Sequence, residues 1–435
     1  MKRRTFLNLG TLAAGAVLLP PRLSFARAGR SDARFVLVIL RGALDGLAAV
    51  PPYGDRDYPQ LRGDFALRPP GEAKGALPLD GFFGLHPSLQ FLRESYAAHE
   101  LIVFHALASP YRERSHFDGQ DVLENGTPQP HALQTGWLNR ALAAAPSAAK
   151  RDTGVALGQN VPLVMRGPAE VTSWSPSRLA GPDDDTLARL TDLYAHDPLL
   201  SVRLADALAA DRIAAEDGVG HAMAEDLAGR APSAVREPAA PQPPAPMTQA
   251  AAAPRAPAAP QPRGGRYAEI VRAAGGFLRQ DEGPRVAVFD TTGWDTHANE
   301  GGAEGQLAGR LGTLDAALAV LKEQLGSAWR DTAVLLVTEF GRTAAINGTR
   351  GTDHGTATMG FLVGGAVAGG RVIADWPGLS AHALYQGRDL APTLDLRCVL
   401  KGLLGEHLGI PPRALADTVF PASESARALR GLVNT

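Results

Sequence analysis

Short apolar runs without polar alternation recur along the chain, and they constrain the fold more than any other feature. They cover residues 35–40, 101–106, 285–290, 332–338 and 360–364. Runs of this kind are typical of strands that are buried on both faces of a parallel sheet. Segments with helical periodicity separate them, at residues 87–97, 117–124 and 307–325. Strands that alternate with helices predict an α/β fold, with a mostly parallel central sheet and helices on both faces.

The first 28 residues have the features of an export signal. Arg3 and Arg4 are adjacent, residues 9–19 are apolar, and small residues at the end of the segment suit cleavage. The alternative is an amphipathic N-terminal helix, but Pro20 ends the apolar run abruptly. We therefore expect export by the twin-arginine (Tat) translocase and a periplasmic or secreted mature protein. The run is shorter than the ~20 residues of a membrane span, and no later segment qualifies.

Charge and cysteine content narrow the possible partners. Removal of residues 1–28 takes away five basic and no acidic residues, which leaves 38 basic against 45 acidic residues, a net charge of −7. Nucleic acid is not an expected partner, because phosphate binding needs clustered positive charge. Cys398 is the only cysteine, so the chain has no intramolecular disulfide.

A single domain over residues 29–435 is expected, with one insert. Residues 231–263 hold ten of the 34 prolines and much alanine, which predicts a disordered or extended segment. Strand patterns occur on both sides of it, so an inserted surface loop is favoured over a domain boundary. Residues 184–229 have the pattern of one or two polar helices.

Chemically active residue types follow the first two predicted strands. Arg41 and Asp45 lie in a glycine-rich turn after the first strand, where a tight turn with a solvated Asp is the alternative. Arg114, Ser115 and His116 stand at a predicted helix start after the second strand. Ser115 has two interpretations, an N-cap or a nucleophile that a metal activates. Working residues of α/β sheets lie past the carboxyl ends of strands, so both groups are site candidates.

The later strands are followed by acidic residues and histidines. Asp295 and His297 follow the strand at 286–289, with a capping Asp and a surface His as the alternative. Further candidates are Glu339, Arg342, Asp353 and His354. Carboxylate oxygens and imidazole nitrogens bind divalent metals, and an arginine fork binds phosphate or sulfate. Several such groups at the strand ends of one sheet predict a divalent metal site, for zinc, manganese, calcium or magnesium.

Five motifs give the chain a resemblance to a known family. They are Arg-Gly-x-x-Asp-Gly at 41–46, Ser-His at 115–116, Gly-Trp-Asp-x-His at 293–297, Glu-Phe-Gly-Arg-Thr at 339–343 and Gly-Thr-Asp-His-Gly at 351–355. In combination they resemble the bacterial "domain of unknown function 1501" family, over residues 34–410 without the insert. That family looks like a branch of the alkaline phosphatase and sulfatase superfamily, whose members bind one or two divalent metals at strand ends.

The resemblance implies roles for individual residues. Asp295 and His297 would hold one metal, and His354 would complete that site. Glu339 and Asp45 stand where the superfamily has carboxylates near the metals, and Asp353 accompanies His354 in its motif. Ser115 matches the nucleophile position. A Glu-Phe pair replaces the Asp-His pair of the second metal, so that site lacks an imidazole, and no Cys-x-Pro-x-Arg element is present.

Together these features predict a metal-dependent hydrolase of phosphate or sulfate esters, with a small-molecule or polymer ester as substrate. The metal would activate Ser115 or a water as nucleophile. Arg41, Arg114 or Arg342 would hold the anion, and His116 would be a ligand or a general acid. The alternative is a degenerate, non-catalytic member that acts as a periplasmic binding or assembly protein.

Overall fold

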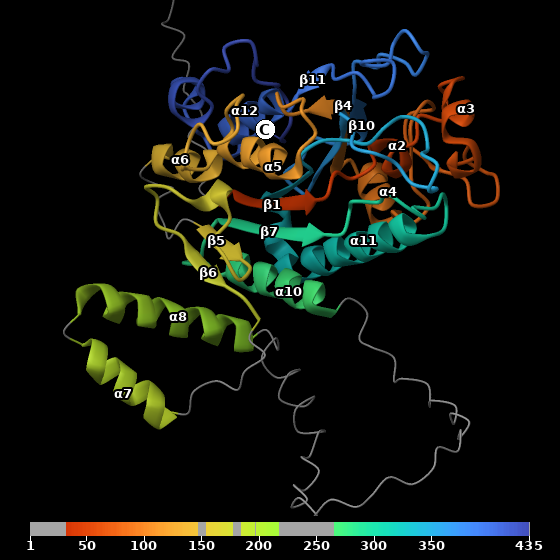
Figure 1. Ribbon diagram of the computed structural model, residues 1–435. Coiled ribbons are helices and arrows are strands. Elements are labelled where there is room, and N and C mark those ends of the chain that lie inside the picture. The colour runs from red at the N-terminus through yellow and green to blue at the C-terminus, as the bar shows by residue number, and fades with distance from the viewer. Residues whose placement is uncertain (1–31, 147–153, 177–183, 196, 217–264, 435) are drawn as a thin grey trace, which may run out of the picture.

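The fold is built around a central sheet of nine strands (Figure 1). The computed structural model describes residues 32–146, 154–176, 184–195, 197–216 and 265–434. The expected signal at 1–28 and the insert at 231–263 lie outside these residues. The strands are β1 (Arg34–Arg41), β4 (Leu101–Ala108), β5 (Gly154–Leu157), β6 (Thr172–Trp174), β7 (Val286–Thr292), β8 (Thr332–Val337), β9 (Thr358–Val363), β10 (Arg371–Ile373) and β11 (Leu394–Asp395). A small antiparallel pair, β2 (Leu77–Pro78) and β3 (Gly84–Leu85), stands apart.

The sheet is mostly parallel, in the order β10-β4-β9-β8-β1-β7-β5-β6, with β11 also paired to β4. Only β9 runs antiparallel, to both β4 and β8. The α/β fold class is confirmed, but the 360–364 run belongs to an antiparallel strand. An antiparallel neighbour needs no helical crossover, and no helix lies between β8 and β9. The start of β9 therefore lies at the same sheet edge as the ends of β1, β7 and β8.

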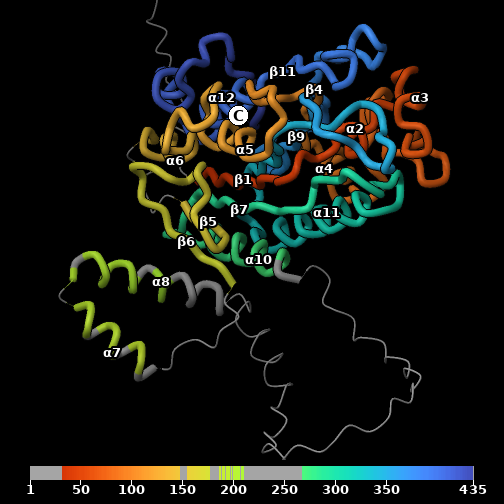
Figure 2. Tube along the Cα trace, viewed as in Figure 1, coloured from red at the N-terminus to blue at the C-terminus, as the bar shows by residue number. Residues whose placement is uncertain are grey.

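Helices cover both faces of the sheet. The side chains of each strand point alternately to the two faces, and both sets are apolar. On β1, Val36 and Val38 face one apolar core, whereas Phe35 and Leu37 face the other. The first core is closed by α4 (Gln90–Ala97), α10 (Gly265–Arg279) and α11 (Gln306–Leu325). The second is closed by α5 (His116–Asn125), α6 (Trp137–Ala144) and α12 (Leu396–His407) (Figure 2). This two-sided burial explains why the strand runs carry no polar alternation.

The predicted helices form close to their expected bounds. Residues 87–97, 117–124 and 307–325 correspond to α4, α5 and α11. Within 184–229, two helices are described, α7 (Asp184–Tyr194) and α8 (Pro198–Glu216). Three further helices are short: α2 (Gly46–Ala49), α3 (Tyr58–Arg62) and α13 (Pro412–Ala414). Among the described residues, no helix is long and apolar enough to span a membrane.

Candidate metal centre

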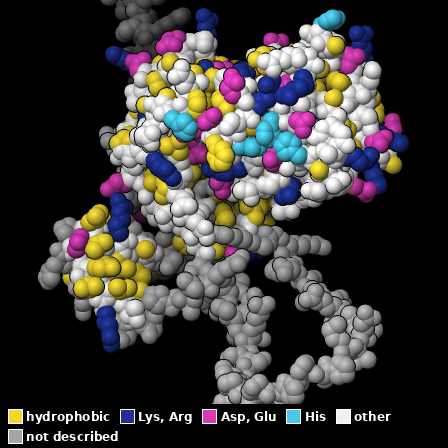
Figure 3. Space-filling model, viewed as in Figure 1, with side chains coloured by type: hydrophobic (Ala, Val, Ile, Leu, Met, Phe, Trp, Pro, Cys, Tyr) yellow, Lys and Arg dark blue, Asp and Glu magenta, His cyan; other side chains and the backbone are white. Residues whose placement is uncertain are grey.

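Four candidate ligands from three segments of the chain meet at the carboxyl edge of the sheet. The ligand atoms of His116, Asp295 and His354 all lie within 4.8 Å of one another. His297 joins them, with Nε2 3.1 Å from Asp295 Oδ1 and 3.0 Å from His354 Nε2. His116 begins α5, Asp295 and His297 follow β7, and His354 precedes β9. Figure 3 shows histidine side chains gathered on one face of the molecule, among acidic and basic ones.

The hydrogen bonds of two histidines bring their Nε2 atoms within 3.0 Å of each other. His354 Nδ1 donates to the carbonyl oxygen of Arg114 (3.0 Å), which can only accept, so the proton of this ring is on Nδ1. Burial first, and then the charges of His116 and Arg342, lower the pKa of His354, which keeps it neutral and leaves a lone pair on Nε2. His297 has a carboxylate acceptor at each ring nitrogen, Asp353 Oδ1 at 3.3 Å from Nδ1 and Asp295 Oδ1 at 3.1 Å from Nε2. A cation between the two Nε2 atoms would be bound by both rings once the proton of His297 is on Nδ1, beside Asp353.

His116 contributes a nitrogen that no protein group satisfies. Its Nδ1 donates to Glu339 Oε1 (2.8 Å), while its buried Nε2 has no hydrogen-bond partner and lies 3.4 Å from Asp295 Oδ2. An unsatisfied buried polar atom is costly, so it indicates a missing partner. The hydrogen bond to Glu339 raises the pKa of His116, so a proton and a metal ion compete for Nε2. The residues present fit a divalent cation with imidazole ligands.

Arg342 fixes the only carboxylate of the cluster. This arginine is 2% exposed, and its Nη1 donates to Asp295 Oδ1 (2.7 Å). Its Nε and Nη2 bond Thr352. Burial acts to raise the pKa of Asp295, but the hydrogen bond and charge of Arg342 outweigh it and lower this pKa. Arg342 therefore keeps Asp295 ionised and oriented.

Glu339 lies behind His116, not among the candidate ligands. Its Oε1 accepts from His116 Nδ1, Gly42 N (2.9 Å) and Gln120 Nε2 (3.1 Å), and its Oε2 accepts from Thr338 Oγ1 (2.9 Å). The side chain is fully buried. Because Glu339 accepts from His116 Nδ1, it holds this candidate ligand in one tautomer and one orientation. No motif singled out Gln120; its position one helical turn after His116 is the signal that could have indicated it.

Asp353 has the same relation to His297. Its Oδ1 accepts from Asn347 Nδ2 (2.9 Å) and faces His297 Nδ1. The expected ligands Glu339 and Asp353 therefore both support imidazoles, a common arrangement around metal-binding histidines. Asn347, which no motif singled out, completes this support by donating also to the carbonyl oxygen of His297 (2.9 Å).

Asp45 does not join the cluster. It caps α2, accepting from Leu47 N (2.9 Å) and Ala48 N (3.2 Å), and forms a buried ion pair with Arg62. Glu300 contacts the same nitrogen of Arg62, with its Oε1 3.5 Å from Nη2. The physical reason is chain geometry, because the turn after β1 carries Asp45 away from the sheet edge and into the start of α2.

Ser115 lies next to the cluster in the sequence, whereas two predicted anion-binding arginines, Arg114 and Arg41, form ion pairs with carboxylates outside the cluster. Ser115 is the N-cap residue of α5, but its side chain makes no capping hydrogen bond. The Arg114 guanidinium pairs with buried Asp389 (2.7 Å), and its backbone adopts φ 61°, which is unusual for a non-glycine residue. That conformation accompanies the carbonyl contact to His354. Arg41 pairs with Glu124 (2.8 Å) and lines a separate cavity.

Gly42 shows why the first motif contains glycine. Its φ is +120°, and a Cβ placed there would lie 2.6 Å from the backbone nitrogen of Asp295. A side chain would therefore push the metal-binding loop away from β1. The amide of Gly42 also donates to Glu339, so this residue braces two parts of the site.

The described residues thus define an α/β protein with a histidine–aspartate cluster, suited to a divalent cation, at the carboxyl edge of its sheet. The chain belongs to the family described as "Protein of unknown function (DUF1501)", whose model matches residues 102–419. The match contains all four clustered residues, so the family resemblance is confirmed. It begins later than the expected residue 34, which leaves the 41–46 turn outside it. No curated protein matches the chain.

Similarity to solved structures is weak. One similar chain comes from the "Crystal structure of Ps i-CgsB in complex with k-i-k-neocarrahexaose", at 11% identity and a TM-score of 0.36. The alignment covers 91% of this chain and 77% of that chain. Similarity at this level supports no statement about function.

Proposed function

We propose that the protein is an exported, metal-dependent hydrolase of phosphate or sulfate esters, related to the alkaline phosphatase and sulfatase superfamily. One observation carries the proposal: three imidazole nitrogens and one carboxylate converge, and the far nitrogen of each ring has an acceptor, namely Glu339, Asp353 or the Arg114 carbonyl. These acceptors can hold one proton of each ring away from the cluster, which leaves the converging nitrogens to a metal ion.

The donor set narrows the choice of metal. Imidazole suits zinc and the related transition metals, whereas calcium and magnesium take mostly oxygen ligands. With His116, His297 and His354 against the single carboxylate of Asp295, zinc is favoured over manganese, calcium and magnesium. A bound ion of this kind would polarise the ester and acidify an attacking hydroxyl or water.

The residues around the cluster supply the other parts of the reaction. Ser115 precedes His116 at the N-terminus of α5, a ten-residue helix whose free amides favour an anionic ester. The Ser115 hydroxyl is the proposed nucleophile, with water as the alternative. Arg342 holds Asp295 in place, and its positive charge favours an anion nearby. Arg41 and Arg114 are not assigned to anion binding, because both guanidinium groups pair with carboxylates.

Metal analysis and a hydrolysis assay test this proposal. We expect about one divalent ion per purified chain, by elemental mass spectrometry, and hydrolysis of p-nitrophenyl phosphate or sulfate. The double variant Asp295→Ala/His297→Ala should lose both. A matched control is Asp118→Ala/His131→Ala, which removes an Asp–His pair (3.2 Å) outside the cluster. Failure to bind zinc or manganese, with no hydrolysis of either ester, would overturn the proposal.

A non-catalytic function is the second candidate, and the state of Glu339 favours it. Glu339 is fully buried, and its Oε1 accepts three hydrogen bonds, one of them from His116, so this carboxylate supports that histidine instead of a second metal. A single-metal member could bind a phosphate- or sulfate-bearing polymer in the periplasm, or assist assembly, without hydrolysis. Tight metal binding without hydrolysis of either ester, together with metal-dependent retention on a phosphate- or sulfate-bearing matrix, would favour this function.

Export through the Tat translocase is part of the proposal and rests on the sequence. Replacing Arg3 and Arg4 by lysine should retain the protein in the cytoplasm, as fractionation of cells would show. Unchanged export of that variant would contradict the Tat route but not the hydrolase.

A further inference from the structure

A second hollow opens at the carboxyl edge of the sheet, beside β7. On one side β7 pairs with β1 as far as Thr292. On the other side its pairing with β5 ends at Val288. The last residues of β7, Asp290, Thr291 and Thr292, therefore have no strand neighbour on that side, and their burial ends after Phe289. Crevices beyond the carboxyl ends of strands are the usual binding places in α/β sheets.

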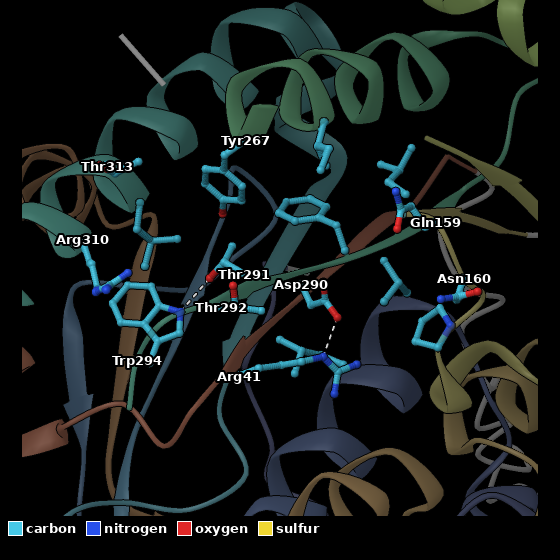
Figure 4. Close-up of a pocket in the computed structure, with 18 of the residues that line it drawn as sticks. Arg41, Gln159, Asn160, Tyr267, Asp290, Thr291, Thr292, Trp294, Arg310 and Thr313 are labelled. Atoms are coloured by element: carbon cyan, nitrogen blue, oxygen red, sulfur yellow. Dashed lines mark hydrogen bonds and ion pairs between the residues drawn. The ribbon is translucent and has the colours of Figure 1, made fainter. Parts of the chain in front are cut away.

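The resulting cavity has a volume of about 790 Å³, within the range typical of small-molecule sites. Its lining comes from the ends of β1, β5 and β7 and from α10 and α11. Figure 4 shows Arg310 and Trp294 at one end and Gln159 and Asn160 at the other, with Tyr267 between them.

Three polar groups in the lining lack partners or have spare capacity. The Tyr267 hydroxyl is buried without a hydrogen-bond partner, and Figure 4 shows it directed toward Thr291 and Thr292. The Arg310 guanidinium is exposed and makes no hydrogen bond or ion pair with the described residues. The Asp290 side chain is 44% exposed, and only its Oδ2 is used, by Arg41.

The position of Arg310 depends on the glycine of the Gly-Trp-Asp-x-His motif. A Cβ on Gly293 would lie 2.1 Å from Arg310 Nη1, and the φ of this residue is +93°. The guanidinium therefore rests on the backbone of the motif. Trp294 is fixed in the same wall, because its Nε1 donates to Thr291 Oγ1 (2.7 Å).

We infer that this cavity binds an acidic saccharide. Sugar hydroxyls both donate and accept, and the cavity offers a carboxylate, two side-chain amides and several hydroxyls. Phe289 and Trp294 form part of the floor of the cavity, but both are 2% exposed, so polar groups and charge carry the recognition. Among the described residues Arg310 has no counter-ion, so its positive charge selects a ligand with a carboxylate or sulfate. Binding here requires no metal and is independent of the proposed hydrolysis.

Titration calorimetry with two probes tests the inference. Hyaluronan tetrasaccharide is the acidic probe and cellotetraose the neutral one. We expect saturable binding of the acidic probe, which quenches or enhances tryptophan fluorescence through Trp294. Treatment with EDTA should leave this binding unchanged, so its result is separable from failure of the metal-dependent proposal.

Two variants locate the binding. Tyr267→Phe removes one hydroxyl and should weaken binding of the acidic probe about three- to tenfold. Arg310→Gln should weaken it about tenfold or more, because a charged hydrogen bond is lost. Matched controls are Tyr96→Phe on α4 and Arg413→Gln on α13, where the arginine is 94% exposed. Both should bind as the wild type does. Melting temperatures confirm that all four variants fold.

The outcomes are decisive in each direction. Selective binding of the acidic probe, weakened by both cavity variants and by neither control, supports the inference. Absence of saturable binding by the acidic probe overturns it, as does binding that Tyr267→Phe and Arg310→Gln leave intact. Equal binding of cellotetraose overturns the charge selectivity assigned to Arg310.

Discussion

Replacing Glu339 by glutamine tests whether a hidden carboxylate sets the metal affinity of the cluster. Glutamine has the same size, and its carbonyl oxygen can keep the bonds from His116, Gly42 and Gln120. Its amide can donate to Thr338 Oγ1, which now donates to Glu339 Oε2. The substitution thus removes the charge while preserving the contacts, and it isolates the electrostatic support of the histidine.

The expected loss follows from one hydrogen bond. The contact between His116 Nδ1 and Glu339 Oε1, at 2.8 Å, changes from charge-assisted to neutral. Charge-assisted bonds contribute roughly twice as much as neutral ones, a difference of about 1–1.5 kcal/mol. Metal affinity should therefore fall about tenfold, at the lower end of the ~10–100-fold reported for residues that orient metal-binding histidines.

Competition with a chromophoric chelator measures this affinity for zinc. Glu100→Gln is the matched control, since Glu100 accepts from Lys322 Nζ (2.6 Å) and Trp329 Nε1 (3.2 Å) just before β4, at the opposite edge of the sheet. It should bind zinc as the wild type does. The melting temperature of metal-free Glu339→Gln should fall somewhat, because the lowered pKa of Glu339 means that its ionised form stabilises the fold; zinc affinity is therefore measured below the melting temperature of both proteins. Wild-type zinc affinity in Glu339→Gln would refute the reasoning.

Three further predictions concern the surroundings of the cluster. Burial and the neighbouring Asp45 raise the pKa of Glu300 to about 8 against the opposing charge of Arg62, so the folded state holds a proton that the unfolded state releases. Stability should fall as pH rises from about 5 to 8, by at most ~1.4 kcal/mol per pH unit, and urea titrations of Glu300→Gln should show a flatter dependence. Gly42→Ala should destabilise the fold by more than ~1 kcal/mol in urea titrations, because its φ and the contact with Asp295 exclude a Cβ. Zinc at 100 times its dissociation constant should raise the unfolding free energy of the metal-free protein by ~2.7 kcal/mol, and His354→Gln should reduce this gain sharply.

The sequence predicted the parts of the fold whose burial leaves a local pattern. β1, β4, β7 and β8 are covered on both sides, so each is a continuous apolar run. The direction of β9 could not be inferred, because a strand buried on both faces has the same composition whichever way it runs. β5, β6 and β10 have only three or four residues each, too few to show any period.

For the site, the sequence identified the residue types but not their order around the cluster. Asp295 and Asp353 each stand in a motif with a histidine, yet one faces the other candidate ligands and one supports an imidazole. That difference depends on how loops from distant strands approach each other, which no local spacing records. Asp45 looked equivalent to both, but the turn after β1 places it at the cap of α2.

The balance of charge at the cluster bears on what it binds. Asp295 is the only carboxylate that faces the three histidines, and the buried Arg342 already pairs with it. Burial acts to raise the pKa of Glu339, but hydrogen bonds, first that from His116, lower it, so this carboxylate is also ionised. Asp353 beside His297 is ionised as well, because the hydrogen bond from Asn347 lowers its pKa. With a divalent ion bound, the three positive charges of the ion and Arg342 therefore balance the three negative charges of Asp295, Glu339 and Asp353. Glu339 is fully buried behind His116, whereas Asp295 is 40% exposed at the cluster, so the ion itself is the charge that an incoming anion meets. Both candidate functions, hydrolysis of an anionic ester and binding of an anionic polymer, use that ion, and the fate of the ester bond distinguishes them.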